Sequence, residues 1–144
     1  MEIFSAGPSS GYALQFLSGG AFNPADSTTY YFGNLPFAPV TGALNRPLWV
    51  PRAGTVTAVY GVVIAAVAGS NENTTLSFRL NNTTDTTITS ALELSAAGLR
   101  TDFSNAALAI AVAAGDYFTL KWATPAWVTN PTTVSFGGTV FIAI

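Results

Sequence analysis

The sequence predicts an all-β fold, an antiparallel β-sandwich of the jelly-roll type with about eight strands. Short segments rich in β-branched and aromatic residues recur along the 144-residue chain. Clusters of Gly, Pro, Asn and Asp separate these segments and mark turns. Strands do not alternate with helical patterns, which disfavours a doubly wound parallel sheet. A chain of this length is sufficient for one domain with a buried core.

The expected strands follow the apolar patterns in chain order. The segment 55–68 is almost continuously apolar and β-branched, so we expect it to be covered on both faces, with Gly61 as a bulge. Its unbroken apolar part is shorter than the ~20 residues that a membrane-spanning helix requires. The segments 75–80 and 117–123 alternate polar and apolar residues, as strands with one buried face do. The eight predicted strands are 28–32, 47–50, 55–68, 75–80, 86–94, 107–113, 117–123 and 133–144.

The first 27 residues differ from the rest of the chain. Gly and Ser interrupt isolated large apolar side chains there, and neither helical nor strand periodicity persists. We therefore predict an extended, flexible N-terminal arm over 1–27 and a jelly-roll domain over 28–144. Two interpretations of the arm stay open, a segment that docks on another surface and an N-terminal strand that packs on its own domain. The apolar residues with which a docking arm would make contact are Phe4, Tyr12, Leu14, Phe16 and Leu17.

The composition argues against catalysis. The chain contains no His and no Cys, so Ser-His-Asp and Cys-His nucleophilic systems are impossible and the commonest transition-metal ligands are missing. No phosphate-binding loop or dinucleotide fingerprint is present. The Asn- and Asp-rich turns lack the spacing of a calcium-binding loop. We expect no enzymatic activity, no catalytic residue, no metal and no cofactor.

The charge pattern points to protein contacts. Only 8% of the residues are charged, and the net charge is −2. The five basic residues are scattered singly, without the stripe that neutralises several phosphates, so we expect no nucleic-acid partner. A surface with so few charges protects a free monomer poorly against association. We therefore expect copies of the chain, or another partner, to cover part of this surface.

Asp116 is the acid that most resembles a buried catalytic carboxylate. It follows Gly115 between the apolar segment Leu108–Ala113 and the alternating segment Tyr117–Ala123. No His, Cys or suitable second acid is available to give it a reaction. Gly-Asp is also a frequent turn dipeptide, because Gly adopts positive φ and Asp bonds to nearby backbone. We assign Asp116 to a hairpin turn between the two segments.

Three tryptophans could stack against a sugar, as in a lectin. Trp122 faces the predicted core, because it lies on the apolar side of the alternating segment 117–123. Trp127 lies in a proline-containing loop and is the candidate for an exposed ligand contact. A structural role for these rings, in the core or in an interface, is the competing interpretation.

Three stretches of the chain carry a family resemblance. VPRAGTVTAVYGVV resembles the entry into a long core strand of trimeric jelly rolls, and AVAAGDYFTLKW resembles a hairpin of the same group. VSFGGTVFIAI resembles the closing strand of complement-type and tumour-necrosis-factor-like heads. Over residues 46–144, the chain is similar to such domains in structural proteins of tailed phages. It looks most like capsid cement, or decoration, proteins.

The resemblance implies a homotrimer in which the C-terminal strands pack near the three-fold axis. The residues themselves agree, since the last strand is apolar on both faces and must be covered on both. The resemblance further implies a virion protein on the outer capsid surface, made in the host cytoplasm, with the major capsid protein as partner. The alternative is a receptor- or carbohydrate-binding head of a tail fibre, with Trp127 in its site. The expected trimer interface comprises Phe136, Val140, Phe141, Ile142 and Ile144.

Overall fold

Two antiparallel sheets face each other in the computed structural model, which describes residues 11–20, 22–69, 71–94 and 100–144. This part of the chain contains strands and turns and no helix. The ten strands are β1 (Tyr12–Ser18), β2 (Thr29–Phe32), β3 (Leu48–Trp49), β4 (Gly54–Ile64), β5 (Asn73–Leu80), β6 (Thr84–Glu93), β7 (Arg100–Asn105), β8 (Ile110–Val112), β9 (Tyr117–Ala123) and β10 (Ser135–Ala143).

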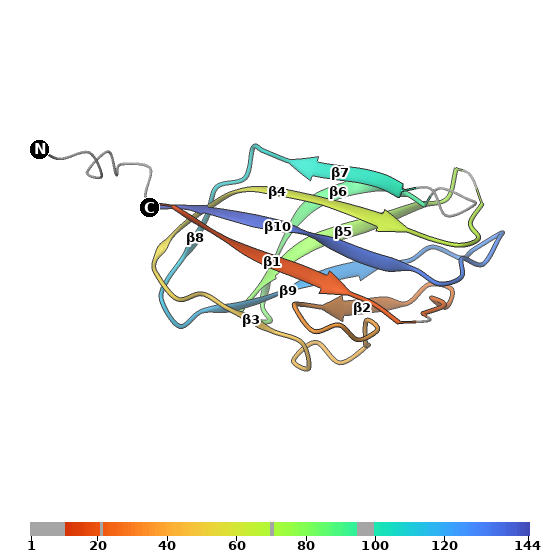
Figure 1. Cartoon of the computed structure of the whole chain (residues 1–144), viewed down its shortest axis with the longest axis horizontal. Coiled ribbons are helices and arrows are strands. Elements are labelled where there is room, and N and C mark those ends of the chain that lie inside the picture. Colours follow the sequence, from red (N-terminus) through yellow and green to blue (C-terminus); the bar gives the residue numbers. More distant parts are fainter. Residues whose placement is uncertain (1–10, 21, 70, 95–99) are drawn as a thin grey trace, which may run out of the picture.

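The strand order is that of a jelly roll. The first sheet, sheet A, has the order β1-β10-β4-β7, and β8 pairs with the beginning of β4. The second sheet, sheet B, has the order β2-β9-β5-β6, and β3 pairs with β9. In Figure 1, β1, β10 and β4 run side by side in one layer, and the last strand ends beside the beginning of β1. The predicted all-β antiparallel sandwich is therefore confirmed.

The predicted N-terminal arm needs correction over residues 12–18. These residues form β1, which pairs along its whole length with β10, from Tyr12 opposite Ile142 to Ser18 opposite Phe136. Phe16 lies in the core with 1% of its surface exposed. Of the two interpretations left open, a strand on its own domain is the one that these residues adopt, and the boundary at residue 27 is not a domain boundary. The physical reason is that β1 covers a row of backbone groups on β10 that would otherwise be an unpaired edge.

Four strands of sheet A meet in one inward-facing row. Phe16 on β1 lies opposite Gly138 on β10, Gly138 lies opposite Gly61 on β4, and Gly61 lies opposite Phe103 on β7. A Cβ atom at Gly138 would collide with the Phe16 ring, and one at Gly61 would collide with the Phe103 ring. The two rings stack over the glycines, with centroids 6.3 Å apart and an interplanar angle of 25°. The glycine pair therefore provides the space that these aromatic rings occupy.

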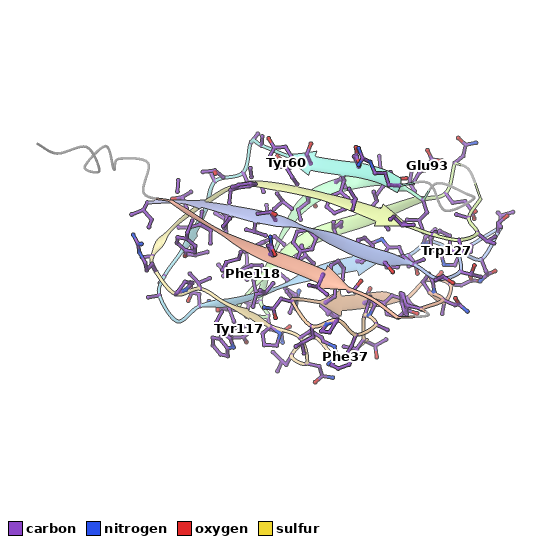
Figure 2. All side chains as sticks on the ribbon, in the orientation of Figure 1. Phe37, Tyr60, Glu93, Tyr117, Phe118 and Trp127 are labelled. Atoms are coloured by element: carbon purple, nitrogen blue, oxygen red, sulfur yellow. The ribbon has the colours of Figure 1, made fainter. Side chains whose placement is uncertain are left out.

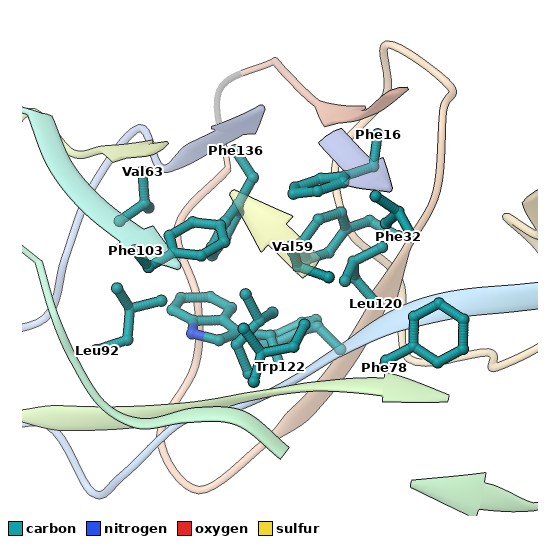
Figure 3. Packing of buried hydrophobic residues seen from close by; sticks show 14 of the residues in the cluster. Phe16, Phe32, Val59, Val63, Phe78, Leu92, Phe103, Leu120, Trp122 and Phe136 are labelled. Atoms are coloured by element: carbon teal, nitrogen blue, oxygen red, sulfur yellow. The ribbon is translucent and has the colours of Figure 1, made fainter. Parts of the chain in front are cut away.

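Phe136 joins the two sheets at the centre of the core. Its ring stacks on Phe32 with centroids 4.6 Å apart and meets Trp122 edge-on at 5.0 Å. Figure 3 shows these rings filling the space between the sheets. The buried indole nitrogen of Trp122 donates to Thr74 Oγ1 at 2.7 Å, and that hydroxyl donates to the carbonyl oxygen of Leu92 at 2.9 Å. The buried indole N–H and the Thr74 hydroxyl group therefore both have hydrogen-bond partners, as buried polar groups require.

Two local predictions on the central strands were wrong. The loop expected before residue 106 contains β7 (Arg100–Asn105), which pairs with β4 and places Phe103 in the core. The bulge expected at Gly61 lies instead near Thr57, where the register of β4 and β10 shifts between Phe141 and Ile142. Gly61 lies in regular pairing with both neighbouring strands. Its missing side chain leaves room for the Phe103 ring instead of marking a bulge.

The predicted hairpin at Asp116 was also wrong. β8 pairs with β4 in sheet A, whereas β9 pairs with β5, β2 and β3 in sheet B. The turn between them therefore carries the chain from one sheet to the other. It keeps the features of a tight turn, because Gly115 has φ of 88° and Asp116 N–H donates to the Ala113 carbonyl oxygen at 3.1 Å.

The neighbouring glycines of β10 give a test of the glycine row. We expect Gly138→Ala to destabilise the protein by about 1–3 kcal/mol, because the new methyl group collides with the Tyr60 carbonyl oxygen and with the Phe16 ring. Gly137→Ala is the matched control, since a Cβ there has no heavy atom within 4 Å. The measurement is urea-induced unfolding followed by tryptophan fluorescence. Equal stability of the two variants would contradict the packing role of Gly138.

Candidate functional site

The outer face of sheet A has no charge on three neighbouring strands. β1, β10 and β4 contain no Asp, Glu, Lys or Arg. Tyr60 on β4 is 47% exposed and Phe141 on β10 is 41% exposed, and their rings meet edge-on with centroids 5.8 Å apart. The nearest charges on this sheet are Arg100 and Asp102 of β7, which form an exposed ion pair at 3.1 Å. We call the face formed by β1, β10 and β4 the uncharged face.

Two open depressions lie on the uncharged face. The larger has a volume of about 780 Å³ and extends from β1 across β10 and β4 to the ion pair on β7. Gly137 contributes to its floor, because the absence of a side chain there leaves open space. The smaller depression, of about 460 Å³, lies where β1 begins and β10 ends, and Phe141 and Ile144 line it. The face therefore combines apolar projections with hollows that a second surface can fill.

The predicted interface residues divide between the two faces of β10. Phe136, Val140 and Ile142 face the protein's own core and are at most 3% exposed, so they are unavailable to another subunit. Phe141 and Ile144 are 41% and 49% exposed and belong to the outer surface. The alternation of the strand is the reason, since successive side chains point to opposite faces. Sequence reasoning missed Tyr60, which lies on β4, the strand next to β10, and faces outward like Phe141.

The predicted arm residues belong to sheet A where the structure describes them. Phe16 is core, and Leu14 is a partly buried residue packed against the core. Leu17 lines the larger depression. The hydroxyl group of Tyr12 donates to the carbonyl oxygen of Arg52 at 2.5 Å, which fastens β1 to the segment before β4. Phe4 lies outside the described residues.

Trp127 is not the exposed ring that its loop suggested. It is 8% exposed, and its indole nitrogen donates to the carbonyl oxygen of Ala25 at 3.1 Å. Segments far away in the sequence cover it, which is why its local context was misleading. Trp49 is the exposed tryptophan, with 62% of its surface accessible. The signal that was available is the two-residue alternation Leu48–Trp49, in which only one side chain can face the core.

The outer face of sheet B differs because it carries a charged network. The carboxylate of Asp85 accepts hydrogen bonds from Arg79 at 2.8 Å and from Lys121 at 2.6 Å. Partial burial raises the pKa of Asp85, but the hydrogen bonds and positive charges of Lys121 and Arg79 outweigh it and lower the pKa overall. The three side chains of this network are paired with one another.

Asp116 serves the turn as predicted, although the turn joins two sheets. One carboxylate oxygen accepts from the backbone N–H of Ala113 at 2.8 Å, and the other accepts from the Asn81 side-chain amide at 3.1 Å. These two hydrogen bonds lower the pKa of Asp116, because they favour the charged form. The described residues contain no group of three or more His, Cys, Asp or Glu side chains placed to hold a metal ion. They also include no helix long and apolar enough to cross a membrane.

The lowered pKa of Asp116 predicts a pH-dependent contribution to stability. The ionised form stabilises the folded state above the unfolded pKa, and this contribution disappears as the pH falls below 3.8 through the folded pKa. We expect Asp116→Asn to be less stable than the wild type at pH 7, with the difference narrowing in acid. Urea midpoints measured from pH 7 to strongly acidic pH test this. The titration of Asp85 contributes equally to the stability of both proteins, so it drops out of the difference between them. A difference that stayed constant across this range would contradict the assigned bonds.

Comparisons with known proteins give only a distant structural likeness. The chain matches no protein-family model and no curated protein sequence. It is similar to a chain in a solved structure of infectious bursal disease virus, Gx strain, with 10% sequence identity and a TM-score of 0.46. The match covers 93% of this chain and 32% of that chain, so the protein spans about a third of its neighbour's length. At this level of similarity, the function must be argued from the molecule itself.

Proposed function

We propose that the protein assembles through the uncharged face into a homotrimer. The observation that carries this proposal is the exposure of Tyr60 and Phe141 on strands without a single charged residue. Exposed apolar patches of this kind mark interaction sites in soluble proteins. The segment 55–68 was expected to be covered on both faces, yet within a single chain Tyr60 and Ile64 of this segment remain exposed. In a closed ring of three, each contact joins two different surfaces, so the projecting rings of one copy meet the depressions on the uncharged face of the next copy.

We further propose that the trimer is a structural component of a virus particle. In this function, it is a cement protein that binds the major capsid protein on the outer surface of the shell. The resemblance of three segments to structural proteins of tailed phages supports this proposal, and so does the low charge of the chain. Many copies bound to a regular shell gain strength from multivalency, so each contact can be small. The competing function as a tail-fibre head loses its expected ligand contact, because Trp127 is buried.

The oligomeric state is the first test. We expect Phe141→Asp to convert the trimer into monomers, because a carboxylate in the apolar interface would be desolvated without a partner. Val128→Asp is the matched control, since Val128 is 89% exposed and lies outside sheet A. Multi-angle light scattering measures the mass of each protein. A wild-type monomer at micromolar concentration, or a trimer that tolerates Phe141→Asp, would contradict the proposed interface.

Capsid binding is the second test, and the structure changes its design. Deleting residues 1–10 leaves β1 intact, whereas deleting residues 1–20 removes β1 and Phe16 from the core. If residues 1–10 carry the capsid contact, the shorter deletion keeps the trimer and loses binding to undecorated capsids. The longer deletion is expected to impair folding. Cosedimentation with capsids is the measurement, and wild-type binding by the shorter deletion would contradict a role for residues 1–10.

A further inference from the structure

An exposed tryptophan stands at one end of sheet B. On β3, Leu48 enters the core with 4% exposure, while Trp49 points outward with 62% exposure. Trp49 lies opposite Tyr117 on β9, and the two rings are 5.3 Å apart between centroids with an interplanar angle of 57°. Burial in the core explains Trp122 and Trp127 but not Trp49. Figure 2 places Tyr117 and Trp127 toward opposite ends of the sandwich, so this pair is a separate feature from the loop singled out by sequence.

Two polar residues, Asn81 and Asp116, bond to the backbone beside the aromatic pair. Backbone N–H of Tyr117 donates to Asn81 Oδ1 at 3.0 Å, and backbone N–H of Asn81 donates to the Tyr117 carbonyl oxygen at 2.8 Å. Asn81 also donates to the carboxylate of Asp116 at 3.1 Å. Asp116 in turn lies beside the residue that follows Trp49, because Val50 N–H donates to its carbonyl oxygen at 2.8 Å. These backbone contacts bring Trp49 on β3 and Tyr117 on β9 to the same end of sheet B as Asn81, in the β5–β6 turn, and Asp116, in the β8–β9 turn.

The polar groups retain hydrogen-bonding capacity. A carboxylate has about four lone-pair sites, and the protein uses two of those on Asp116. The Asn81 amide has two N–H donors, and one of them is used by Asp116. Both residues are half-buried rather than enclosed. An acceptor and a donor held side by side match a pair of neighbouring hydroxyl groups, which donate and accept in the same way.

We propose that Trp49, Tyr117, Asn81 and Asp116 form a binding site for a neutral pyranose at the end of a glycan. The apolar C–H face of the sugar stacks on the exposed Trp49 ring, the tilted Tyr117 ring flanks it, and two adjacent hydroxyl groups bond to Asp116 and Asn81. The site lies on sheet B, away from the proposed trimer surface, so it does not rest on the proposed function. It adds a ligand-binding activity to a protein otherwise assigned to assembly.

A sugar fits this cluster better than a second protein surface does. A flat protein contact over Trp49 would also remove water from Asp116, whose carboxylate accepts from two neutral donors, the Ala113 N–H and the Asn81 amide. A small ligand leaves part of the carboxylate in water while it covers the rings. The apolar face that suits a second copy of the chain lies on the other sheet, where β1, β10 and β4 carry no charge.

Glycan binding by the intact protein tests the proposal. The probes are an array of neutral oligosaccharides, followed by titration with methyl pyranosides of glucose, galactose, mannose and N-acetylglucosamine. Because Trp122 and Trp127 are buried, a change in tryptophan emission on titration reports mainly on Trp49. We expect Trp49→Ala to reduce the affinity by about tenfold or more through loss of the stacked ring. Trp49→Phe is expected to retain part of the affinity, and Asp116→Asn to weaken it.

Phe37→Ala is the matched control, because Phe37 is a 56% exposed aromatic residue outside the cluster. It should bind glycans like the wild type. Urea midpoints and light scattering on the Trp49 and Phe37 variants verify that fold and oligomeric state are unchanged, which separates this proposal from that of the trimer. Asp116→Asn is expected to have a lower urea midpoint, so its binding is measured without denaturant, where light scattering verifies the oligomeric state. The proposal is overturned if the wild type binds none of the probes, or if Trp49→Ala binds them with wild-type affinity. Loss of capsid binding by Trp49→Ala, without any glycan binding by the wild type, would assign the ring to a protein contact instead.

Discussion

The rest of the structure depends on the close approach of two glycines across the central strands of sheet A. Gly61 and Gly138 face each other on the inner surface, and neither position has room for a Cβ atom. Phe16 and Phe103 fill the space from the two flanking strands. Four strands are thereby held in one row, and the row includes the N-terminal strand β1. Aromatic rings over strand glycines restore the side-chain contacts that glycine alone cannot make.

The same stretch of β10 also shapes the outside of the molecule. Because side chains alternate along a strand, Gly138 faces the core and its neighbour Gly137 faces solvent. The missing side chain at Gly137 leaves a hollow beside Tyr60, whose ring projects from the neighbouring strand. One Gly-Gly pair therefore admits an aromatic ring inside and opens a depression outside. Core packing and the candidate assembly surface are linked in this way, although they lie on opposite faces of the sheet.

Local sequence patterns predicted the parts of the fold that local patterns determine. The alternation around Leu76, and that around Trp122, correctly placed both side chains in the core. For residues 12–18 the sequence left a docking arm and a strand on the same domain both open. The partner strand β10 lies more than a hundred residues away, and β1 is stabilised by that pairing rather than by its own composition. The same limit applies to the surface sites. Trp127 is covered by residues near Ala25, a contact that no pattern around Trp127 contains.

The corner at Asp116 shows why a structural role and a binding role need not compete. Asp116 holds Ala113, next to the last strand of sheet A before the crossing, and Asn81, in a turn of sheet B. These bonds fix the carboxylate and the amide in place before any ligand arrives. Preorganised polar groups lose less conformational entropy on binding than free ones do, which increases affinity. From the sequence, Asp116 was either a catalytic carboxylate or a turn residue. In the structure, the turn that Asp116 stabilises also positions the polar groups of the proposed sugar site.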